Sequence, residues 1–148
     1  MLFLFWRYVL AYEGYLVKIG NYTLPHKYIA AESYLVTNYG QDLDSYQDTD
    51  GFLHRQALEN QAPKFELETR NMLNDDELWD LLSNIQANYI DAVEKKASVK
   101  LYIPELHKYI TNDMYFADMP IKIYRADKNG IQYQSFRIAA VSYGVKTI

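Results

Sequence analysis

One segment of this chain has the periodicity of a helix, and much of the remainder alternates in the manner of strands. Asn74, followed three residues later by Glu77, forms a capping-box pattern at the start of that segment. Apolar residues then recur with helical spacing at Leu78, Leu81, Leu82, Ile85 and Tyr89. The pattern predicts an amphipathic helix over about residues 75–89. Such a helix must bury its stripe against another layer, so the rest of the chain is expected to supply a sheet.

Alternating polar and apolar residues predict strands on both sides of this helix. In residues 64–70, Phe65, Leu67 and Thr69 would face one side of a sheet and charged residues the other. Further strands are predicted over residues 15–24 (two short ones around Gly20-Asn21), 52–58 and 99–103. Between them, residues 38–51 are polar and rich in turn formers, which indicates a long loop or a loose hairpin tip.

The last part of the chain predicts a hairpin. Asp127-Lys-Asn-Gly130 is a strong turn signal, because Asn-Gly tolerates positive φ at both central positions. It would join a strand over residues 119–124, with Ile121 and Ile123 inward, to a returning strand over residues 131–143 that is long enough to need a bulge or bend. These elements together predict an α+β fold: a mostly antiparallel β-sandwich or rolled sheet with one helix.

Composition restricts the chemistry that the chain can perform. Its 148 residues fit one domain, and fifteen of them are Tyr, a residue that suits half-buried sheets and protein interfaces. The absence of Cys excludes disulfides, thiolate metal sites and a Cys nucleophile. A net charge of −4 without a basic run argues against specific binding of nucleic acid.

The N-terminal residues 1–14 form an apolar extension to a single domain over residues 15–148. The apolar run is about half of the roughly 20 residues that span a membrane, and Arg7 interrupts it. It also lacks the basic start and cleavage site of a secretory signal. We expect either an extra strand or short helix that packs on a neighbour, or an upstream extension; a membrane-adsorbed segment is a third interpretation.

Motifs for catalysis or metal binding do not emerge from the sequence. The acidic residues 42–50 fail as an EF-hand, because Tyr46 and Ala57 would occupy loop positions that need oxygen ligands. A calcium loop of another kind is an alternative to the favoured interpretation, a solvated loop rich in turns. Glu66 and Glu68 share a predicted strand face with Arg70, which is typical of an exposed charged strand. The histidines His26, His54 and His107 lack metal-binding spacing. The sequence therefore predicts a protein that is not an enzyme and holds no cofactor or metal.

Short motifs along residues 15–143 resemble a family of small tail proteins from siphophages and prophages. In chain order they are Leu16-Val-Lys-Ile-Gly-Asn21, Pro25, Asp50-Gly51, His54-Arg55, Phe65-Glu-Leu67, the helix residues Leu73, Glu77, Leu78, Leu81 and Leu82, then Tyr102-Ile-Pro104, Met114-Tyr-Phe-Ala-Asp118 and Pro120. The chain departs from the family in residues 1–14, which are additional, and in Phe136–Ser142, which lacks an expected Trp.

The resemblance implies a fold similar to tail-tube and distal-tail proteins, and a structural role in the tube or near the baseplate. It places the protein in the virion tail, after assembly in the host cytoplasm. The implied partners are further copies in a sixfold ring, neighbouring tail proteins and the tape-measure protein. An alternative function is a carbohydrate- or protein-binding β-sandwich module of a virion or cell surface; a hydrolase with dispersed carboxylates is the least favoured.

A ring needs a head-to-tail interface that closes, and loops and strand edges commonly supply one. We expect the interface to use the apolar N-terminal segment, the loop over residues 38–51 and the hairpin tip over residues 125–131. The expected interface residues are Phe3, Phe5, Trp6, Tyr39, Tyr46, Asp50, Arg55, Lys128 and Asn129.

Overall fold

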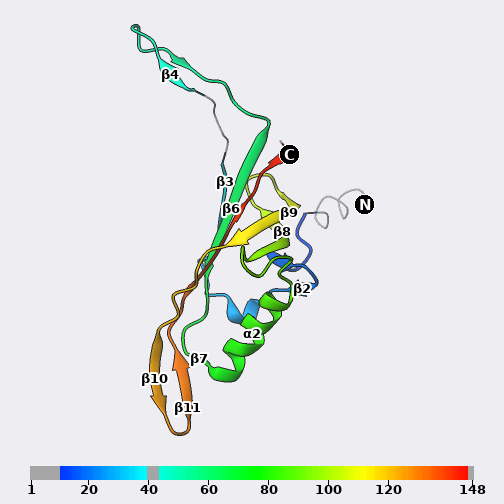
Figure 1. The fold of residues 1–148 in the computed structure, drawn as a ribbon, viewed down its shortest axis with the longest axis vertical. Helices are drawn as coiled ribbons and strands as arrows, with labels where there is room; N and C mark the ends of the chain where they lie inside the picture. Colours follow the sequence, from blue (N-terminus) through cyan, green and yellow to red (C-terminus); the bar gives the residue numbers. More distant parts are fainter. Residues whose placement is uncertain (1–10, 40–43, 147–148) are drawn as a thin grey trace, which may run out of the picture.

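A computed structural model of the protein describes residues 11–39 and 44–146. Figure 1 shows an elongated molecule in which a sheet and a helix form the body, while two hairpins project from opposite ends. The α+β class, with mostly antiparallel strands and one α-helix, is confirmed for the described residues.

The elements follow in chain order. The helices are the 3-10 helix η1 (His26–Tyr28) and the α-helix α2 (Asp75–Ala87). The strands are β1 (Val17–Ile19), β2 (Tyr22–Thr23), β3 (Leu35–Tyr39), β4 (Tyr46–Gln47), β5 (Leu53–His54), β6 (Asn60–Glu68), β7 (Leu73–Asn74), β8 (Lys96–Ile103), β9 (Lys108–Phe116), β10 (Ile123–Asp127), β11 (Gly130–Tyr133), β12 (Arg137–Ser142) and β13 (Val145–Lys146).

Within the described residues the main sheet has eight strands. Strands β6, β12, β9, β8, β1 and β2 lie side by side in that order, and both β13 and β3 also pair with β6. Strand β6 lies between β12, with which it pairs through residues 64–68, and β3, with which it pairs through residues 62–66. A smaller sheet has the order β10-β11-β7, and β4 pairs with β5 alone. The long β6 therefore joins the body of the molecule to the projecting hairpin β4–β5 (Figure 1).

The core lies where the inward rows of the main sheet meet the apolar stripe of α2. As the alternation predicts, Phe65, Leu67 and Thr69 are buried. The other large, fully buried side chains of the core include Ile19, Leu24, Leu73, Leu81, Ile85, Leu101, Ile103, Met114 and Ile138. Burial of one such side chain contributes about 1.5–3 kcal/mol, so this cluster is the main source of stability in the body.

Helix α2 begins as its sequence predicts. The side chain of Asn74 accepts a hydrogen bond from the Glu77 amide at 2.8 Å, and the Asn74 amide donates to the Glu77 carboxylate at 3.3 Å. These two bonds satisfy amide groups that the helix itself leaves unpaired. The helix ends at Ala87, and Tyr89 packs against the core from just beyond it.

Two predicted strands differ from the observed ones. The strand expected over residues 119–124 begins only at Ile123, whose side chain is 52% exposed rather than inward. Pro120 lacks the amide needed for strand pairing, and this segment crosses from the main sheet to the smaller one. The expected bend in residues 131–143 is real: it divides them between β11 of the smaller sheet and β12 of the main sheet.

The tyrosines of the body should make stability fall in alkali. Burial raises the pKa of both Tyr22 and Tyr28 to about 12, from an ordinary value of 10.0, with the Asp80 carboxylate adding to the effect. The folded chain holds these protons more tightly than the unfolded chain does. The stability they contribute is therefore present below pH 10 and lost as the pH rises toward 12.

Urea denaturation at a series of pH values is expected to show this loss of unfolding free energy between about pH 10 and pH 12. Tyr28→Phe should make this fall in unfolding free energy with pH shallower, because the variant lacks the Tyr28 phenol, whose proton the folded chain holds more tightly. The exposed Tyr46 provides the matched control: Tyr46→Phe should leave the slope unchanged. An equal slope in both variants would contradict the assignment to buried tyrosines.

Candidate assembly interface

A hairpin arm, defined as residues 44–58, projects from one end of the body (Figure 1). Its large apolar side chains are exposed rather than packed: Phe52 is 68% exposed and Leu53 is 50% exposed, and Tyr46 and Leu58 are exposed as well. A cluster of this kind on an isolated molecule indicates a surface that another molecule covers.

The arm tip has a defined local structure. The Asp48 carboxylate accepts hydrogen bonds from the amides of Asp50 and Phe52, both at 3.0 Å, which closes the turn through Gly51. Its second oxygen lies 2.9 Å from Nε2 of His54, and this contact holds the pKa of Asp48 below its usual range. Asp48 therefore organises the turn that presents Phe52.

Stacked rings also brace the arm tip, and His54 belongs to both sets of contacts. The rings of Tyr46 and His54 lie 4.8 Å apart and nearly parallel, across the β4–β5 pair. The ring centroids of Phe52 and His54 lie 5.6 Å apart in an edge-to-face arrangement. Aromatic side chains presented on a braced hairpin offer contact area at a low cost in conformational entropy, which is typical of binding surfaces.

A second hairpin, defined as residues 122–131, projects from the opposite end of the molecule (Figure 1). All five residues of β10 are exposed, Ile123 and Tyr124 among them. The Asp127 carboxylate accepts from the Asn129 amide at 2.8 Å and fixes the predicted turn. Because β10 is the last strand of its sheet in the part of the chain that is described, its outer backbone edge is open to pairing.

Five of the nine residues expected at the interface lie on these two hairpins. Tyr46, Asp50 and Arg55 lie on the arm, and Lys128 and Asn129 form the turn of the second hairpin. The backbone of Tyr39 lies at the end of β3, opposite Ala62. Phe3, Phe5 and Trp6 lie outside the described residues. The two groups are far apart within one copy, so a contact between them would need two copies.

Four exposed apolar residues of the two hairpins are not among the interface residues expected from the sequence. Phe52 and Leu53 on the arm, and Ile123 and Tyr124 on the second hairpin, are exposed. The position of Phe52-Leu53 directly after a polar turn-forming segment could have indicated the first pair, because an isolated hairpin tip has no core to bury them. Ile123 of the second pair was not expected at the surface, because the alternation of residues 119–124 predicted that it faces the core.

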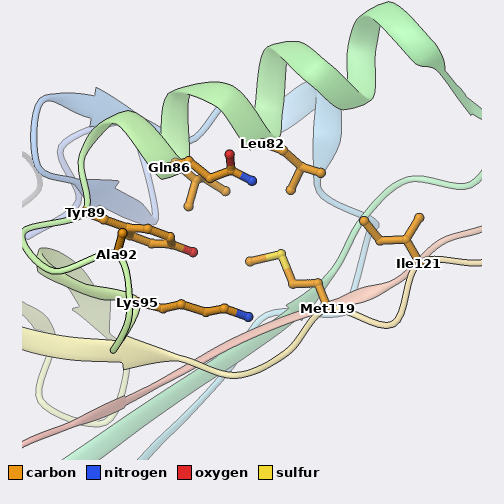
Figure 2. Close-up of a pocket in the computed structure, with 8 residues that line it drawn as sticks. Leu82, Gln86, Tyr89, Ala92, Lys95, Met119 and Ile121 are labelled. Atoms are coloured by element: carbon orange, nitrogen blue, oxygen red, sulfur yellow. The ribbon is translucent and has the colours of Figure 1, made fainter.

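One cavity, of about 440 Å³, lies between the C-terminal half of α2 and the segment leading to β10 (Figure 2). Its lining residues are Leu82, Ile85, Gln86, Tyr89, Ala92, Lys95, Met119 and Ile121. The Lys95 amine donates to Asp118 at 2.7 Å, which raises the pKa of Lys95 and lowers that of Asp118. The walls are mainly apolar side chains beside the paired Lys95 amine, and such a lining suits contact with a group that is mostly apolar.

The described residues hold neither a cluster of metal-ion ligands nor a helix that could span a membrane. Within residues 11–39 and 44–146, no three side chains of His, Asp or Glu gather as ligands for a metal ion. In the same ranges, no helix is long and apolar enough to cross a membrane.

Comparisons with known proteins bear on the family and the fold. A family model described as a family of unknown function (DUF6711) matches residues 10–143. No curated protein gives a match. A chain in the virion of a native gene transfer agent (GTA) particle has 12% sequence identity and a TM-score of 0.50, over 89% of this chain and 92% of that one.

A chain in the tail of an empty GTA particle with C6 symmetry has 12% identity and a TM-score of 0.49, over 90% of this chain and 96% of that one. At identities this low, the likeness to the native particle's chain concerns the fold alone.

Proposed function

The chain belongs to this family of unknown function, DUF6711, and we propose that it is a structural subunit of a phage-like tail that works by assembling with copies of itself. The observation that carries the proposal is the pair of hairpins at opposite ends of one body, each with exposed apolar side chains (Figure 1). Surfaces of this kind gain free energy when a partner removes them from water.

The two ends are chemically different, and this fits a head-to-tail contact. In an isologous dimer the same surface of both copies is used, and assembly stops at two. When the arm of one copy binds a different surface of the next, the pair still has one unused arm and one unused partner surface, so further copies can be added. Such a contact closes into a ring when its rotation divides a full turn, and otherwise continues as a helix. Ring formation of this kind needs no active site, so the proposed role is not enzymatic.

The finer features of the proposal come from the resemblance to siphophage and prophage tail proteins. They are a sixfold ring in the tail tube or at its distal end, contact with neighbouring tail proteins and the tape-measure protein, and a location in the virion tail after assembly in the host cytoplasm. The fold similarity to a chain of a GTA virion supports a place in a particle. The division into an apolar extension, residues 1–14, and a domain, residues 15–148, belongs to this proposal.

The interface residues are also part of the proposal. On the arm they are Tyr46, Asp50 and Arg55, with Phe52 and Leu53 added from the structure. On the second hairpin they are Lys128 and Asn129. Phe3, Phe5, Trp6 and Tyr39 complete the set expected from the sequence.

The size of the purified full-length chain tests this function. Sedimentation velocity over a hundredfold range of concentration is expected to show reversible growth from monomer to a discrete larger species, and negative-stain microscopy should show rings or short tubes. A chain that stays monomeric at every concentration, and also in the presence of tail proteins from the same particle, would overturn the proposal. A monomer that binds glycans would favour the alternative of a carbohydrate-binding module.

A further inference from the structure

We infer that the arm of one copy docks on the second hairpin of the next copy, through opposite charges, exposed apolar side chains and the open edge of β10. The inference rests on the proposed self-assembly and names the two surfaces that meet.

The two surfaces carry opposite charge. The arm, residues 44–58, holds Asp44, Asp48 and Asp50 against Arg55, so its formal charge is negative. The second hairpin, residues 122–131, holds the basic residues Lys122, Arg125 and Lys128 against Asp127, so its formal charge is positive. The chain as a whole has a net charge of −4, so its basic end differs from the average surface. The positive charge of this end is complementary to the negative charge of the arm.

The positive charge of the second hairpin is available to a partner. Lys128 makes no ion pair within the described residues, and Arg125 has only a loose contact of 3.6 Å with Asp127 while its side chain stays 72% exposed. Four basic residues of the body are held by carboxylates of the body: Arg70 by Glu77, Lys95 by Asp118, Lys100 by Glu13 and Arg137 by Glu66. The hairpin instead gathers three basic residues within ten positions and offers them to acidic residues from outside.

Apolar and backbone groups add to the charge match. Phe52 and Leu53 on the arm, and Ile123 and Tyr124 on β10, are each at least half exposed and could cover one another. In the described chain β4 and β5 pair only with each other, and β10 is the end of its sheet. Edge-to-edge pairing would extend one sheet across two copies and satisfy backbone groups that are otherwise left to water.

The geometry excludes contact within one copy. The arm and the second hairpin project in opposite directions from the body, on either side of the main sheet's long strands (Figure 1). Their complementary surfaces can therefore meet only between copies. Each added copy would present a new arm and a new hairpin, which is the property that a ring or tube requires.

Charge reversal in the full-length chain tests this pairing. One variant carries Asp44→Lys with Asp50→Lys on the arm, and the other carries Arg125→Glu with Lys128→Glu on the second hairpin. Asp48 is left intact because it organises the arm turn. Each variant alone is expected to need at least tenfold more protein to assemble, since like charges then face each other.

Mixing the two variants provides the decisive measurement. In an equimolar mixture, the basic arm of one variant can meet the acidic hairpin of the other, and the acidic arm can meet the basic hairpin. Assembly is therefore expected to return toward the wild-type concentration, and the same recovery is expected when all four substitutions share one chain. Glu105→Lys with Lys108→Glu, exposed on the body, is the control and should assemble as wild type.

The outcomes separate this inference from the proposed function. If the wild-type chain assembles but the two variants assemble as well as wild type, or their defects persist in the mixture, the arm and hairpin do not pair and the inference is overturned. If the wild-type chain itself does not assemble, the proposed function fails first. Recovery in the mixture, with two separately defective variants, supports the pairing, because a folding defect would not be corrected by a second defective chain.

Discussion

Phe65→Ala is expected to lower the free energy of unfolding by about 3–5 kcal/mol, the largest effect on stability that we predict for one substitution. Phe65 is fully buried near the middle of β6, between β3 and β12. The centroid of its ring lies 6.4 Å from that of Tyr34 and 6.2 Å from that of Phe116. Removing it leaves a cavity in the strand that joins the body to the arm.

Urea denaturation followed by circular dichroism measures this loss, as a lower midpoint with an unchanged slope. Since small domains have only about 5–15 kcal/mol of total stability, the variant should also lose a large part of its thermal stability. Phe52→Ala is the matched control, because the same side chain is deleted where it is exposed on the arm. Equal losses for the two variants would show that Phe65 does not lie in the core.

Phe52→Ala combined with Leu53→Ala is expected to have the largest effect on assembly. If these side chains are the buried anchors of the interface, their truncation costs at least about 2 kcal/mol, so the concentration needed for assembly should rise by about 30-fold or more. The unfolding free energy should change little, because neither side chain contributes to the core of the body. Sedimentation velocity and urea denaturation measure the two effects on the same preparation.

Trp79→Ala is the control for this second prediction. Trp79 is a large side chain on α2 with 62% exposure, but it lies on neither hairpin. Wild-type assembly is expected for Trp79→Ala, and a defect as large as that of the arm variant would mean that exposed apolar surface in general drives association. Unchanged assembly in the arm variant would place the interface elsewhere on the molecule.

Several parts of the fold could be predicted because they depend on neighbours in the chain. Asn74 and Glu77 lie three residues apart, so the helix start is encoded locally. The Asp127–Gly130 turn is likewise local, since its residue types permit the backbone angles that the turn needs. The inward row of β6 follows from simple alternation.

Other elements could not be predicted because their sequence signal is mixed. Strand β9 pairs with β8 over eight positions, yet the sequence did not suggest it. Its inward row includes Asn112, a buried polar residue with no hydrogen-bond partner for its side-chain amide within the described residues, and this breaks the apolar alternation. The sequence predicted one long strand over residues 131–143, whereas its two halves, β11 and β12, belong to different sheets. Sequence patterns do not indicate which sheet a strand joins.

The sequence by itself determined the class of the fold, helix α2 and the turn of the second hairpin, because periodicity and capping act between residues that are close along the chain. The tertiary structure decided that β6 pairs with β3 on one side and with β12 and β13 on the other, a choice between strands that are remote in sequence. It also decided which apolar residues stay outside the core. Phe52 and Phe65 are the same residue type thirteen positions apart, and only the path of β6 away from the body leaves one exposed and buries the other.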